Sequence, residues 1–412
     1  MTDARVSRRA FLASVAATAA AAHGPSADRP PRVLLRSSWQ TVNIGDIGHT
    51  PGLLALLERY LPDAEVRLWP SSVGDGVKEL LAKRFPKLAI VEGAAAQKAA
   101  LAECDFLLHG SGPSLVGEKD VARWRTETGK PYGVYGITQA KPSAATAELL
   151  SGAAFAYFRD SVSLKVAKEN GVTCPVMGFA PDAAFAVDVR ADDRADAFLK
   201  ANGLEPGKFL CCVSRLRWTP YWTIPGDKRP FDQKRHDYNQ SKKEYDHAPI
   251  IRAVTEVVRE TPMRVLLCPE DKTQIAITKE NVYDKLPADA KVRVVWRDKY
   301  WLTDEAVSTY VRSAGLFCIE THSPIMAVGN GVPAILCRYV EQTTKGLMWR
   351  DIGLGEWLFD LDDPKDYAGV APAAVAMAKD PAAAKAKALK AQALVRERQR
   401  ETMASVVAAA KR

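Results

Sequence analysis

The sequence lacks the local motifs by which common nucleotide, metal and redox sites are recognised. It has no GxGxxG fingerprint and no GxxxxGK[ST] loop, so no dinucleotide or nucleoside triphosphate site of the usual kinds is indicated. Its seven cysteines include no CxxC pair, and no cluster of metal-ligating residues is visible. Beyond the N-terminal region it also lacks an apolar run of about 20 residues, so no membrane span is expected. The sequence therefore predicts neither a cofactor nor a metal.

The length and charge of the chain indicate how many domains it has and which kinds of partner it can bind. A chain of 412 residues is too long for one typical hydrophobic core, and 47% hydrophobic residues can fill two. Lys and Arg outnumber Asp and Glu by 57 to 49, which gives a formal net charge of +8. This mild excess suits anionic small molecules or acidic glycans, and it falls short of the charge typical of nucleic-acid-binding proteins. We expect two domains and no nucleic acid partner.

The N-terminus is similar to an export signal. Residues 7–12 (SRRAFL) resemble the twin-arginine motif, and an alanine-rich stretch follows to residue 22, where small residues suit cleavage. We expect residues 1–30 to be a twin-arginine signal and linker, and the protein to reach the periplasm or cell envelope. The alternative is a disordered alanine-rich start. The twin-arginine route exports folded cargo, which is compatible with an odd number of cysteines, five of them in apolar runs typical of buried strands.

From residue 31 onward, short β-rich runs alternate with helical stretches, which predicts parallel sheets joined by crossover helices. We expect an α/β fold of two doubly wound, Rossmann-like domains facing across a cleft. The N-terminal domain would span residues 31–200, the C-terminal domain residues 201–365 and a helical tail residues 366–412. Such folds bind ligands at the carboxyl ends of their strands, in the cleft between the lobes.

Two loops that follow predicted strands of the N-terminal domain combine glycines with polar side chains. Glycines let such loops approach a ligand closely, and we expect Thr50-Pro51 to cap and open the helix after the first loop, with free amides that suit an anion. The alternative is that each loop is only a structural turn and that the histidine in the second loop has a structural role. The candidate residues for the cleft are Asn43, Gly45, Asp46, His109, Gly110 and Gly112.

The strongest local signal is the segment FCIETHSPIM at residues 317–326. A buried strand delivers Glu320 and His322 to its end, and Ser323 with the next proline opens a helix whose amides favour an anion. Histidine is the side chain best suited to move a proton near neutral pH. The alternative is a helix cap with a packed core histidine. We favour a functional His322 beside an anion site, at the mouth of the crevice between the lobes.

Other candidates lie near this segment. Arg338 and Lys345 follow the next strand and suit a carboxylate or phosphate, or are two exposed surface cations. Residues 215–247 form a long insertion rich in aromatic and basic residues, including Arg217, Trp218 and Trp222. Long loops of this composition are often lids or sugar-binding elements, although the same mixture suits a protein, a nucleic acid strand or no partner.

Several of these pieces together resemble the polysaccharide pyruvyl transferase family, over roughly residues 32–355. The resemblance is carried by NIGD at 43–46, DFLLHGSG at 105–112, FRDSVS at 158–163, APDAAF at 180–185, VSR at 213–215, the segment from His322 to the proline at 333, and Lys345 with the next glycine. No single piece is specific, but their order and spacing are. The resemblance implies two lobes arranged as in GT-B glycosyltransferases.

The resemblance also implies an activity, the transfer of a pyruvyl group from phosphoenolpyruvate to a saccharide hydroxyl as a ketal, with no cofactor. His322 would act as an acid or base or as partner of the leaving phosphate. Arg215 and Lys345 would neutralise phosphate and carboxylate charge, and Asp46 or Asp182 would orient the acceptor or brace the site.

The sequence departs from the family pattern at Glu320, where the family carries an arginine, and a carboxylate there would repel an anionic donor. Two alternatives therefore remain: a GT-B-like glycosyltransferase that uses another donor, and an exported glycan-binding protein without catalysis.

Overall fold

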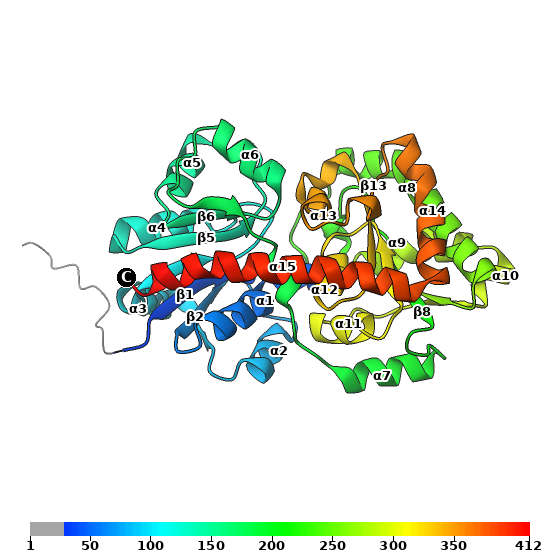
Figure 1. Cartoon of the computed structure of the whole chain (residues 1–412), viewed down its shortest axis with the longest axis horizontal. Coiled ribbons are helices and arrows are strands. Elements are labelled where there is room, and N and C mark those ends of the chain that lie inside the picture. Colours follow the sequence, from blue (N-terminus) through cyan, green and yellow to red (C-terminus); the bar gives the residue numbers. More distant parts are fainter. Residues whose placement is uncertain (1–28) are drawn as a thin grey trace, which may run out of the picture.

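The computed structural model describes residues 29–412, which form two α/β lobes side by side (Figure 1). The expected signal sequence falls in residues 1–28, outside the described part of the chain. Both lobes are built on parallel sheets, so the predicted α/β class with two doubly wound lobes is confirmed.

The first lobe contains a seven-stranded sheet in the order β3-β2-β1-β4-β5-β6-β7. Its strands are β1 (Arg32–Ser37), β2 (Glu65–Pro70), β3 (Ala89–Ile90), β4 (Phe106–His109), β5 (Tyr132–Ile137), β6 (Phe155–Phe158) and β7 (Met177–Phe179). Its helices are α1 (Ile44–Tyr60), α2 (Val77–Arg84), α3 (Gly93–Glu103), α4 (Glu118–Thr128), α5 (Ala144–Ser151) and α6 (Ser161–Glu169). The chain then passes through the short 3₁₀ helix η1 (Ala183–Ala186) to α7 (Asp192–Ala201), which packs on α11 of the second lobe. Helix α7, which the expected boundary at residue 200 assigns to the first domain, thus contacts the second lobe.

The second lobe contains a six-stranded sheet in the order β10-β9-β8-β11-β12-β13. Its strands are β8 (Phe209–Val213), β9 (Arg264–Leu267), β10 (Val294–Trp296), β11 (Gly315–Cys318), β12 (Ala334–Arg338) and β13 (Leu358–Asp360). Its α-helices are α8 (Gln233–Glu260), α9 (Gln274–Asn281), α10 (Ala288–Lys291), α11 (Thr303–Tyr310), α12 (His322–Gly329), α13 (Met348–Asp351) and α14 (Pro364–Lys379). Its 3₁₀ helices are η2 (Tyr221–Thr223), η3 (Tyr283–Lys285), η4 (Val340–Gln342), η5 (Lys345–Leu347) and η6 (Gly355–Trp357).

Burial on both sheet faces explains the near-continuous apolar strands. In the first sheet, Leu34 and Leu107 point into one core with α3 to α6, while Val33, Leu35 and Leu108 point into the other. This second core continues through α1 and α12 into the second lobe, so one apolar core joins the lobes. All seven cysteines are buried and free.

The last helix, α15 (Pro381–Ala410), crosses both lobes on one face of the molecule (Figure 1). It packs against α12 and β11 of the second lobe and against α1, β5 and β6 of the first. Tyr135 and Thr402 are joined by a 2.9 Å hydrogen bond between their hydroxyls, and Gln392 Nε2 donates to the carbonyl of Gly329 at 2.7 Å. The tail therefore ties the two lobes together.

Two helices begin earlier than the sequence suggested. Helix α1 starts at Ile44 rather than after Thr50, because the Asn43 side chain caps it and accepts from the amides of Gly45 and Asp46. Pro51 thus lies inside the helix, and the amides expected to hold an anion are already bonded. Helix α8 starts at Gln233, where Asp232 caps it, so the second half of the insertion at 215–247 is helical rather than a loop.

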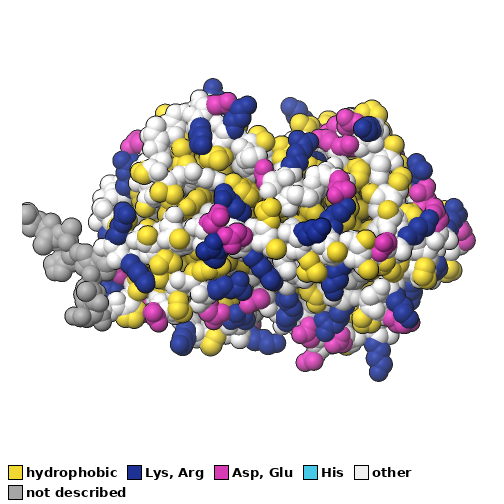
Figure 2. All heavy atoms as spheres, viewed as in Figure 1, with side chains coloured by type: hydrophobic (Ala, Val, Ile, Leu, Met, Phe, Trp, Pro, Cys, Tyr) yellow, Lys and Arg dark blue, Asp and Glu magenta, His cyan; other side chains and the backbone are white. Residues whose placement is uncertain are grey.

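The visible face carries a mixture of basic and acidic side chains, and its outline is notched between the lobes (Figure 2). No helix in residues 29–412 combines the length and the apolar character needed to cross a bilayer.

Candidate functional site

The carboxyl ends of the two sheets face each other where α1 of the first lobe packs on α12 of the second. The contact is close because α1 presents glycines. A Cβ atom at Gly45 would lie 2.2 Å from the Cβ and Nδ1 atoms of His322, and one at Gly52 would lie 2.0 Å from the carbonyl oxygen of Ala183. Only glycine fits at these positions without displacing its neighbour. The lobes are therefore in direct contact at the candidate site.

Backbone hydrogen bonds also join the lobes here. The amide of Ile44 donates to the carbonyl of Glu270 at 2.9 Å, and the amide of Lys272 donates to the carbonyl of Val42 at 3.0 Å. Asn43 and Asp271 form an antiparallel β-bridge between the two bonds. The loop that precedes α1 is thus paired with the loop that follows β9.

The first lobe contributes a buried network around Asp182. Asp182 accepts from Arg159 Nη1 at 2.7 Å and from Ser111 Oγ at 3.1 Å, and it lies 3.0 Å from Nδ1 of His49. Burial alone would raise the pKa of Asp182, but His49 and Arg159 outweigh burial and hold this pKa well below its usual value. The ionised carboxylate therefore fixes the orientation of His49, and a role of Asp182 in bracing the site or orienting an acceptor stays a prediction.

The second lobe contributes His322, which is 5% exposed. Its Nδ1 lies 3.3 Å from Oε1 of Glu270, whose other oxygen accepts from the amide and the hydroxyl of Ser323 at 2.6 and 2.7 Å. Burial lowers the pKa of His322, and the nearby charge of Lys345 lowers it further. The sequence suggested that the imidazole of His322 lies at the mouth of an open crevice. In the structure it does not, because Gly45 and α1 cover it. Ser323 holds Glu270 rather than an anion.

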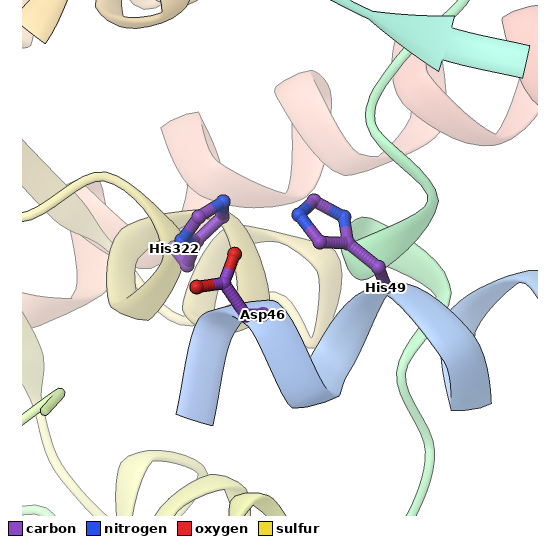
Figure 3. Close-up of side chains that lie close together, drawn as sticks. All are labelled: Asp46, His49 and His322. Atoms are coloured by element: carbon purple, nitrogen blue, oxygen red, sulfur yellow. The ribbon is translucent and has the colours of Figure 1, made fainter. Parts of the chain in front are cut away.

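Asp46, His49 and His322 converge from α1 and α12 (Figure 3). One ligand-type atom from each lies within 4.8 Å of those of the other two, and the two imidazole rings meet edge to face with centroids 4.9 Å apart. The Nε2 atoms of both histidines are buried without a hydrogen-bond partner. These three residues are the group that could hold a metal ion within residues 29–412.

Glu320 and Arg215 form a buried ion pair, with 3.1 Å between Oε1 and Nη1. Gln274 Nε2 also donates to Glu320, at 2.8 Å. Burial raises the pKa of Glu320, an effect that the charge of Arg215 opposes. Glu320 therefore neutralises Arg215, so neither side chain offers a free charge to a ligand.

Lys345 lies at the start of η5, next to the point where Thr344 meets Ser163 of the first lobe at 3.1 Å. No carboxylate of residues 29–412 lies within 4.0 Å of its ammonium. Burial lowers the pKa of Lys345, while Glu320 acts in the opposite direction. Its charge is thus uncompensated by a direct ion pair, unlike that of Arg215.

The two other predicted anion-binding arginines are already paired. Arg217 donates to Asp246 at 2.9 and 3.0 Å, to Asp362 at 2.6 Å and to Glu341 at 3.2 Å. Arg338 pairs with Asp360 and donates to the carbonyl of Thr343 at 2.9 Å. Carboxylates of the same lobe thus occupy the guanidinium group of Arg217 and one nitrogen of Arg338, whose Nε has no hydrogen-bond partner, and donor binding by these two arginines stays a prediction.

The predicted second loop of the first lobe is sealed inside it. His109 is fully buried, stacks on Trp39 and accepts from the amide of Gly117 at 3.0 Å. Burial lowers the pKa of His109 to about 3. Gly110 and Gly112 pack closely against Ser37 and Trp39. The burial of His109 and its hydrogen bond to Gly117 fit the alternative of a structural histidine, and the buried loop is not open to an acceptor saccharide.

The insertion reaches the other lobe at one point. Gln40 Nε2 donates to the hydroxyl of Tyr221 at 3.2 Å, so η2 covers the start of the first lobe's strand-end loop. Trp218 stacks under Arg235, and Trp222 meets Phe231 edge to face. Both tryptophans are half-buried by their own insertion.

Sequence reasoning missed His49 and Glu270. His49 lies in α1, where the sequence predicts a loop, and Glu270 follows β9 in no recognisable motif. Arg159 was noted within the resembling segment FRDSVS but was given no role. The spacing of Asp46 and His49, three apart on one helix face, was the available signal.

Comparison with known proteins supports the two-lobed architecture. A family model described as polysaccharide pyruvyl transferase matches residues 43–340, more than half of the chain. No curated protein matches the sequence significantly.

Among solved structures, HepE of Anabaena in complex with UDP-glucose shares 12% identity at a TM-score of 0.56, covering 92% of this chain and 99% of that one. MnaA of S. aureus with UDP shares 11% identity at a TM-score of 0.54, covering 87% and 90%. UDP-GlcNAc 2-epimerase of Methanocaldococcus jannaschii shares 10% identity at a TM-score of 0.51, covering 84% and 92%. These similarities establish a GT-B-like fold.

Proposed function

Because this chain belongs to the polysaccharide pyruvyl transferase family, which it matches over residues 43–340, we propose that it transfers a pyruvyl group from phosphoenolpyruvate to a saccharide of the cell envelope. In the balanced reaction, two sugar hydroxyls add to C2 of the enolpyruvyl unit and phosphate leaves. One hydroxyl proton goes to C3 and the other departs with the phosphate. The product is a ketal.

One observation carries the proposal: Lys345, next to the point where Thr344 meets Ser163 of the first lobe, has no ion-pair partner in residues 29–412, and its charge lowers the pKa of His322. Departure of phosphate needs positive charge where negative charge accumulates, and a fixed cation in a partly dry site supplies it effectively. Lys345 is therefore the donor-binding cation of the proposed site, and His322 is the partner of the leaving phosphate. Arg215 is held in its pair with Glu320 and acts only by shaping the site.

Substrates cannot reach His322 while α1 covers it, since 5% of the residue is exposed. In the proposed cycle the lobes part along the contact of α1 with α12, admit donor and acceptor, and close for transfer. Such motions of two-lobed enzymes commonly take microseconds to milliseconds.

A second candidate rests on the Glu320–Arg215 pair. Because Glu320 neutralises Arg215, a donor that places less negative charge near Arg215 is an alternative. HepE of Anabaena, which has a similar fold, was solved with UDP-glucose. Under this candidate the chain is a GT-B-like glycosyltransferase. Its acceptor remains a saccharide.

The test is phosphate release from phosphoenolpyruvate by the purified full chain in the presence of a panel of envelope saccharides, with UDP-sugars assayed in parallel. Lys345→Met should reduce kcat/KM for phosphoenolpyruvate by about 100-fold, the usual cost of removing one charge-stabilising donor. The matched control Lys279→Met removes an exposed lysine paired with Asp284 and should leave the rate unchanged. Release of UDP without release of phosphate would instead favour the second candidate, and an unaltered rate in Lys345→Met would refute the role of this cation.

We also propose export by the twin-arginine route, on the strength of residues 7–12 (SRRAFL). A reporter joined after Ala27 should reach the periplasm, and replacement of Arg8 and Arg9 by Lys should retain it in the cytoplasm. Cytoplasmic retention of the unaltered fusion would contradict this localisation.

A further inference from the structure

We propose that Asp46, His49 and His322 bind one divalent transition-metal ion, of the class that imidazole and carboxylate ligands prefer, such as Zn²⁺. Two ligands come from the first lobe and one from the second. The family match, the structural similarities and the proposed function do not imply such an ion.

The first argument is the state of the two imidazoles. His49 Nδ1 faces the oxygens of Ser111 and Asp182, and His322 Nδ1 faces Glu270, which has the only acceptor within bonding distance of that nitrogen in residues 29–412. Ionised carboxylates accept hydrogen bonds and do not donate them, so each Nδ1 carries the proton. A neutral imidazole with its proton on Nδ1 has a lone pair on Nε2, and this is the form in which each histidine would bind an ion. This arrangement, a histidine held by a carboxylate through its far nitrogen, is typical of metal-binding histidines.

The second argument is that both lone pairs are unused. His49 is fully buried and His322 is 5% exposed, yet neither Nε2 has a hydrogen-bond partner. Leaving a buried polar atom unpaired costs about 1–3 kcal/mol, and two such atoms on rings whose centroids lie 4.9 Å apart can share one partner. A divalent cation is a partner that accepts both lone pairs at once.

Asp46 supplies the third ligand. It lies three residues before His49 on α1, so both side chains leave the same face of the helix, and Figure 3 shows the carboxylate between the two rings. Gln40 donates to one carboxylate oxygen and leaves the other available. Three protein ligands with a free position are characteristic of catalytic rather than structural zinc sites.

The three ligand atoms must move slightly closer together to bind one ion. The ligand atoms lie within 4.8 Å of one another, whereas two nitrogens at about 2.1 Å from one ion are at most about 4.2 Å apart. A bound ion would therefore have to draw the widest pair closer together by rotation of the side chains. Calcium and magnesium prefer oxygen ligands, so two imidazoles favour zinc or a neighbouring first-row metal.

Binding of an ion has one consequence for the proposed function. Nε2 of His322 cannot hold an ion and a proton together, so in the loaded protein this residue would act on phosphate through the metal. The metal site does not depend on the identity of the donor, because its ligands are all protein atoms.

The test measures metal binding without any substrate, so its failure is separable from failure of the proposed transfer. The full chain is stripped with a chelator, dialysed, and titrated with Zn²⁺ by calorimetry and with Co²⁺ by visible absorption. We expect one ion per chain and cobalt bands typical of nitrogen and oxygen ligation.

Asp46→Asn and His49→Gln should each weaken Zn²⁺ binding by 10-fold or more. His247→Gln is the matched control, because His247 is a buried histidine that also has an unpaired Nε2 but belongs to no such cluster in residues 29–412. It should bind as the unaltered protein does. Circular dichroism establishes that each variant is folded, and the half-buried Asp46 is the safer of the two ligands to change. Absence of stoichiometric binding, or equal affinity in Asp46→Asn and the unaltered protein, would overturn the proposal.

Discussion

Gly45 of the first lobe lies directly against His322 of the second, so that a Cβ atom on Gly45 would be 2.2 Å from the Cβ and Nδ1 of the histidine. Gly45→Ala should therefore force His322 out of place and separate α1 from α12. Overpacking of this kind typically costs about 1–3 kcal/mol of stability. We expect a lower midpoint of urea unfolding, followed by fluorescence, and loss of activity in the phosphate-release assay.

Gly48→Ala provides the control, because its nearest neighbour is the flexible end of Met326, with Sδ at 3.2 Å. That side chain can shift, so stability should change little. If both alanine variants behaved alike, the close contact of Gly45 with His322 would have no special role.

Arg217 is expected to stabilise the second lobe rather than bind a substrate. Arg217→Met would leave Asp246, which is 1% exposed, without its guanidinium partner. Breaking a buried ion pair in this way commonly costs about 3–5 kcal/mol. Chemical denaturation should report this loss. Arg252→Met, which removes an exposed pair with Glu256, should leave the midpoint nearly unchanged.

An Arg217→Met protein of normal stability but with a raised KM for phosphoenolpyruvate would restore the original expectation that Arg217 binds the donor.

His109 should contribute to acid sensitivity. Burial lowers its pKa from 6.5 to about 3, so between these values the unfolded chain binds a proton that the folded chain does not. Stability therefore decreases as the pH falls from about 6.5 towards 3, by up to about 1.4 kcal/mol per pH unit from this group. In His109→Gln the amide oxygen can still accept from the amide of Gly117, and no group titrates. Unfolding free energies measured between pH 7 and 4 should decline less steeply in the variant, and parallel slopes would contradict this assignment.

The tail helix α15 offers a matched pair of substitutions. Val406 is fully buried against the lobes, whereas Ala408 on the same helix is exposed. Val406→Asp would bury an unpaired charge and should cost more than about 3 kcal/mol, while Ala408→Asp should be tolerated. Thermal unfolding and binding of a hydrophobic dye would register the difference. Equal behaviour of the two variants would mean that α15 does not hold the lobes together in solution.

The alternation of strands and helices was enough to predict two parallel sheets, because buried parallel strands are short apolar runs that turn residues separate clearly. The resemblance to the pyruvyl transferase family was likewise confirmed by the family match over residues 43–340. Both signals are local or follow the order of the chain.

The start of α1 was not predictable with the same security, because two local rules compete. Pro51 is typical of a first turn, and Asn43 is typical of a cap, and the structure follows Asn43. With the helix expected to start at Thr50-Pro51, Asp46 and His49 fell in a loop, so the sequence did not show that they share a helix face. The ion pairs of Arg217 and Arg338 were not predictable for another reason: their carboxylate partners come from distant segments, and only the folded chain brings these segments together.

The bridge between Asn43 and Asp271 lies three residues before Asp46 on one side and immediately after Glu270 on the other. Any rotation that parts the lobes must break it, and the same rotation carries His49 and Asp46 away from His322. An opened molecule consequently separates the residues of the proposed site, and the proposed transfer requires that the lobes be joined. A probe of lobe closure, such as a fluorophore pair with one dye on each sheet, would then also report whether the reaction centre is assembled.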